Sequence, residues 1–118
     1  MIISSAMPIP DFRPEYERGI AEADDLLHLF DRNTVTCPRE RWPEAREQLK
    51  ALKARWRDRM HKNDNELGSA FRHAYCDLYI SAGSRPGPKW VSDLHSAQDH
   101  LRWYLGHSIS NRRDKKGA

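Results

Sequence analysis

Between Trp42 and Met60, apolar side chains recur at steps of three and four residues, and this spacing restricts the fold more than any other feature of the chain. The residues are Trp42, Ala45, Leu49, Leu52, Trp56 and Met60. On an α-helix they form one narrow apolar seam, which is typical of helices that pack in a bundle. Because proline is tolerated only in the first turn of a helix, Pro43 indicates that the regular helix begins near this residue.

Three other segments have apolar residues at the same helical spacing. They predict helices over about 13–31, from a cap at Asn63 to Gly83, and from about 90 to 106. Asp11 is a plausible N-cap for the first of these helices, and Asn63 with Glu66 resembles a capping box for the next. The residues between the last two helices, 84–88, include two prolines and a glycine and predict a loop.

These helices fit within one ordinary domain of 118 residues. We therefore predict an all-α, single-domain helical bundle of about four helices over residues 11–109. Residues 1–10 are expected to form a flexible N-terminus, and residues 110–118 are expected to form a disordered basic tail because they contain no apolar anchor.

Composition narrows the class of protein further. The chain has no apolar run of the roughly 18 residues that a membrane span needs, and its start lacks the pattern of a signal peptide. Two cysteines are too few for a disulfide framework. We expect a cytoplasmic protein without a membrane partner, and no sequence motif predicts a cofactor.

Positive charge is concentrated in the middle of the chain. Residues 38–62 carry nine bases and four acids, whereas residues 1–37 carry three bases and seven acids. An electrostatic partner is therefore expected to bind the central segment, helped by the basic tail.

Six cations lie in the second half of the predicted central helix and extend over about 18 Å. On a helix they form two flanks, one with Lys50, Lys53 and Arg57 and the other with Arg55, Arg59 and Lys62. Such a helix can neutralise several phosphates. We predict a non-enzymatic binding module, an accessory subunit or small regulator or inhibitor, that engages nucleic acid or a nucleoprotein complex through these six residues.

Other interpretations of the same residues remain open. The cations can be a solvated face that the acidic first helix partly neutralises, or they can dock an acidic protein surface. Trp103 falls off the apolar stripe of the last helix, which predicts an exposed side chain that marks a partner surface. A protein-protein adaptor or inhibitor without nucleic-acid contact is therefore an alternative, and its seam or Trp103 could also support a homodimer.

Two Arg-to-His spacings resemble the Arg-x(4–6)-His motif of HEPN ribonucleases, which are small helical bundles. They run from Arg102 to His107 and from Arg55 to His61. The resemblance implies that Arg102 stabilises a transition state and His107 acts as acid or base. A HEPN-like ribonuclease is the enzymatic alternative, and the leading prediction assigns no catalytic residue.

Two pairs of side chains have helical spacings that would let each pair share a metal ion. They are His73 with Cys76 and His95 with Asp99. Neither pair has the spacing of a known zinc signature, so we predict no metal site.

Overall fold

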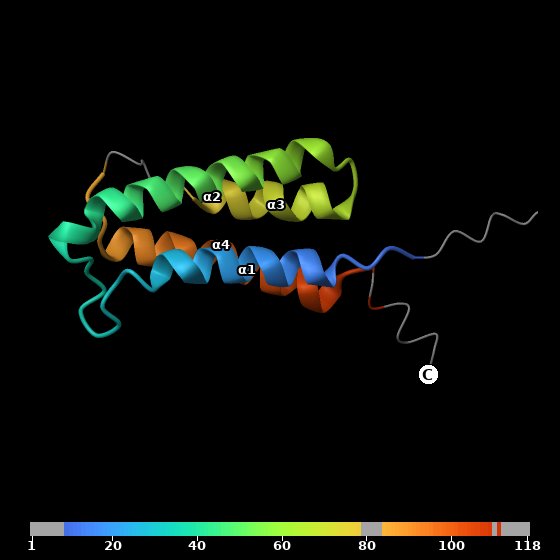
Figure 1. Cartoon of the computed structure of the whole chain (residues 1–118). Coiled ribbons are helices and arrows are strands. Elements are labelled where there is room, and N and C mark those ends of the chain that lie inside the picture. The colour runs from blue at the N-terminus through green and yellow to red at the C-terminus, as the bar shows by residue number, and fades with distance from the viewer. Residues whose placement is uncertain (1–8, 79–83, 110, 112–118) are drawn as a thin grey trace, which may run out of the picture.

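The computed structural model describes residues 9–78, 84–109 and 111, and these residues form four α-helices (Figure 1). The helices are α1 (Arg13–Leu27), α2 (Trp42–Lys62), α3 (Glu66–Asp77) and α4 (Pro88–His107), with a short 3-10 turn η1 (Arg39–Arg41) before α2. No strand occurs in these residues. The prediction of an all-α bundle of about four helices is confirmed, whereas the predicted flexible ends 1–10 and 110–118 lie mostly outside the described residues.

The helices run alternately up and down the bundle (Figure 1). α1 packs against α2 and α4, and α3 also packs against α2 and α4. It follows that α2 and α4 lie diagonally opposite each other. No described helix combines the length and the apolar character that crossing a membrane requires.

The apolar seam of α2 lies in the core, as its spacing predicts. Ala45, Leu49, Leu52 and Trp56 are fully buried, and Trp56 meets the ring of Phe71 from α3 edge-on, with 5.7 Å between ring centroids. Trp42 and Met60, at the two ends of the seam, are only partly buried. Pro43 lies in the first turn of α2, where its missing N–H costs no helical hydrogen bond.

α1 ends at Leu27, four residues before the predicted end at Asp31. The apolar pattern continues beyond the helix because Leu29 and Phe30 are buried through the following turn. The Asp31 carboxylate then accepts hydrogen bonds from the backbone N–H groups of Asn33 and Thr34, at 2.8 and 3.0 Å, and these bonds stabilise the turn.

The start of α1 also differs from the prediction. Phe12 is the N-cap residue, and Asp11 lies one position earlier. The Asp11 carboxylate accepts a hydrogen bond from the Arg13 backbone N–H at 3.1 Å and from the Arg13 guanidinium at 2.8 Å. Asp11 therefore stabilises the first turn without being its cap.

The cap of α3 is Asn65 and not Asn63. The side-chain oxygen of Asn65 accepts from the N–H groups of Leu67 and Gly68, at 3.0 and 3.3 Å. Asn63 instead follows the end of α2. The side-chain amide of Asn63 donates to the Arg59 carbonyl at 2.8 Å, and so satisfies an acceptor that the helix end leaves free.

The other end of α3 also lies earlier than predicted. α3 ends at Asp77, well before the predicted end at Gly83, and Gly83 itself lies outside the described residues.

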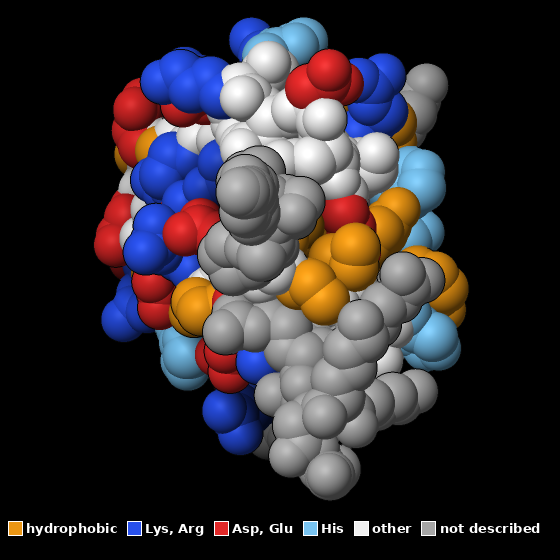
Figure 2. All heavy atoms as spheres, turned by 90° about the vertical axis from the view of Figure 1, so that its right-hand side faces the viewer, with side chains coloured by type: hydrophobic (Ala, Val, Ile, Leu, Met, Phe, Trp, Pro, Cys, Tyr) orange, Lys and Arg blue, Asp and Glu red, His pale blue; other side chains and the backbone are white. Residues whose placement is uncertain are grey.

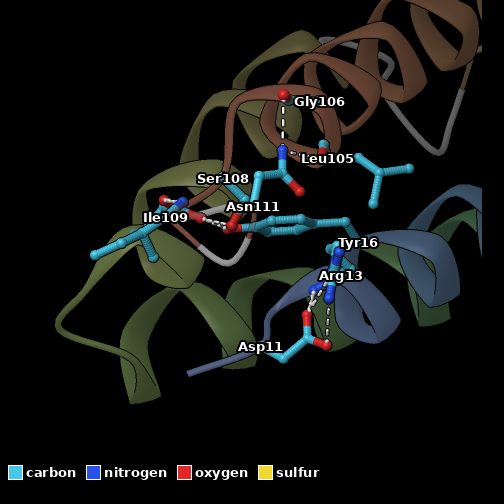
Figure 3. Close-up of polar contacts among 9 residues, drawn as sticks. Asp11, Arg13, Tyr16, Leu105, Gly106, Ser108, Ile109 and Asn111 are labelled. Carbon is cyan, nitrogen blue, oxygen red and sulfur yellow. Dashed lines mark hydrogen bonds and ion pairs between the residues drawn. The ribbon is translucent and has the colours of Figure 1, made fainter. Parts of the chain in front are cut away.

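Glu66 joins three helices at one end of the bundle. Its carboxylate accepts hydrogen bonds from the hydroxyl groups of Tyr16 and Ser108, both at 2.6 Å, and from the Ile109 N–H at 2.9 Å. Figure 3 shows the Tyr16 ring pointing at the segment that follows α4. Burial and the neighbouring Glu66 carboxylate raise the pKa of Tyr16, so its hydroxyl remains a donor.

Candidate nucleic-acid interface

α2 presents a long, positively charged side to solvent. Its 21 residues carry seven Lys and Arg side chains against three acidic ones. At about 1.5 Å per residue, the helix is roughly 32 Å long. The seam faces the core, so the cations lie beside it or opposite to it.

Glu22 of α1 neutralises part of this charge. Its carboxylate forms a two-pronged ion pair with the Arg59 guanidinium, at 2.5 and 2.7 Å, and contacts Arg55 at 3.1 Å. The Arg59 and Glu22 side chains are only 16% and 15% exposed. Arg59, one of the six cations predicted to bind nucleic acid, is therefore largely buried, whereas Arg55 remains about half exposed.

The electrostatics around Glu22 favour its ionised form. Burial raises the pKa of this carboxyl, but the hydrogen bonds and charge of Arg59 lower it by more, helped by a 3.2 Å hydrogen bond from Trp56 Nε1 and by the charge of Arg55. The net result is a pKa below the ordinary value. The alternative of partial neutralisation by the acidic first helix thus applies to this flank.

Two predicted cations pair only weakly, with acids of α2 itself. Lys50 Nζ lies 3.9 Å from Glu47, and Lys62 Nζ lies 3.1 Å from Asp58. The two lysine side chains are 64% and 73% exposed. Because exposed pairs of this spacing contribute only about 0.3–0.5 kcal/mol, both lysines can exchange their partners for phosphates.

The opposite flank of α2 faces α3. The Arg57 guanidinium donates to the Tyr75 hydroxyl, at 2.8 Å from Nη2, and lies 5.6 Å from the Tyr75 ring centroid. This neutral partner holds the guanidinium in place, and Arg57 forms no ion pair within residues 9–78, 84–109 and 111. Lys53, on the same flank, is half-buried. Arg59 and Arg57, which belong to different predicted flanks, are therefore directed toward different neighbouring helices, α1 and α3.

Three further arginines lie close together near the start of α2, and helical spacing did not predict this group. The guanidinium carbons of Arg39, Arg46 and Arg85 lie 5.5, 5.6 and 5.5 Å from the centroid of the Trp42 ring. Arg46 also donates to the Ser84 carbonyl at 3.4 Å. Arg39 and Arg46 belong to the basic segment 38–62, so their charge was predicted. Their proximity to Arg85 was not, because Arg85 lies far away in the sequence.

Trp103 is 56% exposed, which agrees with its position off the stripe of α4. Its indole stacks on the His107 ring, with 4.4 Å between centroids. Because α4 lies diagonally across the bundle from α2, the fold does not bring Trp103 to the cations of α2. The side chains predicted to bind a partner, namely the six cations of α2 and Trp103, therefore lie on two separate surfaces.

The residues of the ribonuclease-like spacings have other partners in the fold. Arg102 pairs with Asp99 at 3.0 Å, and His107 Nδ1 lies 2.9 Å from the Trp103 carbonyl oxygen. In the second spacing, Arg55 pairs with Glu22.

The possible metal ligands also pair differently from their sequence spacing. His73 Nδ1 lies 3.1 Å from the Tyr104 hydroxyl, and Asp99 pairs with Arg102 at 3.0 Å. Among the residues that the structure describes, no three His, Cys, Asp or Glu side chains gather in an arrangement suited to a metal ion.

The end of the bundle at which α2 meets α3 shows how the surface is divided (Figure 2). Many Lys and Arg side chains, with acids between them, gather on the left of this view, and the larger group of apolar side chains lies to the right of its centre. Comparisons of the chain with protein-family models, curated proteins and solved structures found no match. A functional assignment therefore depends on the geometry and chemistry of these surfaces.

Proposed function

We propose that this protein is a non-enzymatic helical module that binds nucleic acid, alone or within a nucleoprotein complex, along the solvent-facing side of α2. The observation that carries the proposal is that Lys50, Arg57 and Lys62 are exposed and have either weak pairs on α2 itself or a neutral partner. In this role the protein acts as an accessory subunit or a small regulator.

A nucleic-acid backbone matches both the length and the chemistry of this surface. A helix of roughly 32 Å extends along about one turn of a duplex or several phosphates of a single strand. The exposed pairs on α2 open at little cost, and the counterions that phosphates release on binding add a favourable, salt-dependent term. Arginine also offers two parallel donors to a phosphate.

The test is binding of a fluorescent oligonucleotide, as DNA and as RNA, measured by anisotropy over a series of salt concentrations. The wild-type affinity should fall steeply with salt. The triple variant Lys50→Gln, Arg57→Gln, Lys62→Gln should bind more weakly at low salt, and its log-log salt slope should be flatter by about 2, because each lost phosphate contact removes roughly 0.7–0.9. Arg59 is left unchanged because it supports the fold.

A matched control removes the same charge elsewhere on the surface. Arg18→Gln, Arg72→Gln and Arg102→Gln replace three exposed arginines of α1, α3 and α4. This variant should keep most of the wild-type affinity and slope. If neither nucleic acid binds at low salt, or if both triple variants lose the same affinity, the interface is not on α2.

The second candidate function is a protein-directed adaptor, which the exposure of Trp103 favours. An adaptor that docks through this indole would bind its partner with little dependence on salt and would lose that binding when the indole is removed.

A further inference from the structure

Three arginines surround the Trp42 ring at the end of the bundle where α2 and α4 begin. We propose that Arg39, Arg46 and Arg85 form a binding site for a phosphate monoester. The site itself is argued from local geometry, whereas its assignment to the terminal phosphate of a bound strand rests on the proposed function.

The three guanidinium groups at this site have no ion-pair partner within the described part of the chain. Each guanidinium carbon lies within 5.6 Å of the same ring centroid, so any two are at most about 11 Å apart. This upper limit exceeds the screening length of about 8 Å at physiological salt, so any repulsion between the guanidinium groups is partly screened. None of the three arginines forms an ion pair with a carboxylate of residues 9–78, 84–109 or 111.

The nearby acids form no ion pairs with these three arginines. Glu44, in the first turn of α2, accepts a hydrogen bond from Gln48 at 3.2 Å. Glu40 lies in the turn before α2 and forms no ion pair within the described part of the chain. The adjoining segment 79–83 contains no acidic residue in its sequence. An anion from solution is therefore the counter-charge that fits.

Arg46 carries a donor that is left without a partner. Its Nε atom is buried and has no acceptor among the described atoms, although its Nη2 atom donates to the Ser84 carbonyl. The stacked Trp42 ring and the Ser84 contact hold the guanidinium in place before a ligand arrives.

Two helix starts add to the positive potential at this end. The N-cap residues of α2 and α4 are Arg41 and Gly87, and neither makes a side-chain capping hydrogen bond. The positive ends of both helix dipoles thus lie on the side of the arginines. Arg41 adds a further exposed guanidinium to the same segment.

This amount of positive charge favours a dianion over a phosphodiester. A phosphate monoester carries a charge of about −1.5 to −2 near neutral pH, with a second pKa near 6, whereas a diester carries one negative charge. Guanidinium groups bind such an oxyanion through paired donors. The chemistry therefore points to a terminal phosphate or to free inorganic phosphate.

The first arm of the test uses inorganic phosphate alone. Calorimetric titration at constant ionic strength should show saturable binding near neutral pH, and this binding should weaken near pH 5, where phosphate is a monoanion. The variant Arg39→Gln, Arg85→Gln should bind phosphate at least about tenfold more weakly, equivalent to about 1.4 kcal/mol. Both arginines are exposed, and urea unfolding confirms that the variant is folded. The single variant Arg85→Gln, expected to lose part of the affinity, provides a second, milder test.

A matched control is Arg18→Gln, Arg102→Gln, which removes two exposed arginines of α1 and α4. This control variant should bind phosphate like the wild type. Equal loss in the two double variants, or titrations that never saturate, would overturn the phosphate site.

The second arm compares one oligonucleotide sequence with a 5′-phosphate, with a 3′-phosphate, and with neither. One phosphorylated form should bind at least about fivefold more tightly than the unphosphorylated strand, and the Arg39→Gln, Arg85→Gln variant should lose this preference. Equal binding of all three strands would overturn the terminal-phosphate assignment while leaving the proposed function intact. Specific binding of inorganic phosphate without binding of any strand would instead overturn the proposed function and support the site.

Discussion

Glu22 is the residue that decides how much of the positive charge of α2 reaches solvent. One carboxylate serves two guanidinium groups, and the buried Arg59 takes both of its oxygen atoms. Arg55, whose side chain is about half exposed, contacts one of the same oxygen atoms at 3.1 Å. A single residue of α1 therefore supports the packing of α1 on α2 and at the same time limits the charge available to a ligand.

Replacing Glu22 with Gln should affect stability and binding in opposite directions. Arg59 would lose its ionised partner while remaining largely buried, so the free energy of unfolding should fall by about 1–3 kcal/mol near neutral pH. The loss of one negative charge and the release of Arg55 should raise oligonucleotide affinity at low salt. Urea unfolding and fluorescence anisotropy measure the two effects separately.

The effect of the Glu22→Gln change on stability should depend on pH. Because the pKa of Glu22 in the fold lies below its ordinary value of 4.5, its stabilising contribution is complete above that value and is lost as the pH falls through the folded pKa. The difference in unfolding free energy between wild type and variant should therefore shrink between about pH 7 and about pH 3. Glu17→Gln, at an exposed position of α1, is the control and should show little difference at either pH. A Glu22 difference that is constant with pH would contradict the assigned ion pair.

At the scale of elements, the contact between α3 and the end of α2 depends on Gly68. A Cβ atom built at Gly68 would lie 1.9 Å from the Asn63 carbonyl oxygen, and the Met60 carbonyl oxygen would be 3.3 Å away. Only glycine allows α3 to start this close to the backbone that ends α2. The turn of three residues between the helices therefore places the charged half of α2 against α3.

Gly68→Ala should lower the free energy of unfolding by about 3 kcal/mol or more, because the neighbouring atoms are backbone and cannot rotate away. The control is Gly106→Ala in α4, where a Cβ would meet nothing within 4 Å. This second change should leave stability unchanged or raise it by up to about 1 kcal/mol, since alanine is the better helix former. Similar results for the two variants in urea unfolding would show that α3 does not pack as closely as described.

The apolar pattern predicted the number and the order of the helices because a buried helical face requires a repeat near 3.6 residues. It predicted some ends wrongly for local reasons. Leu29 and Phe30 continue the pattern of α1 although they lie in a turn, and Asn63 resembles a cap although it ends α2. Apolar spacing reports burial and does not distinguish a helix from a buried turn.

At the scale of the whole molecule, long-range pairs determine which predicted residues share a surface. Glu22 and Arg59 are 37 positions apart, and Trp42 meets Arg85 across the bundle end. Neither pairing follows from helical spacing, because each depends on how the packed helices are rotated and on the path of a loop. The six cations on α2 were predictable as a group, whereas the burial of Arg59 and the separation of Trp103 from that group were not.

The diagonal arrangement of α2 and α4 leads to a prediction about Trp103. A strand bound along α2 would not reach the exposed indole, so Trp103→Ser should leave oligonucleotide affinity within about twofold of wild type and stability within about 0.5 kcal/mol. A base stacked on an indole contributes about 1–3 kcal/mol, which corresponds to roughly fivefold to more than a hundredfold in affinity. Fluorescence anisotropy would therefore distinguish a strand that stacks on Trp103 from one that does not. The Lys50→Gln, Arg57→Gln, Lys62→Gln variant provides the positive control for a true loss. A loss of tenfold or more from Trp103→Ser would mean that the bound strand crosses α4, and the interface would then extend beyond the side of the molecule that α2 presents.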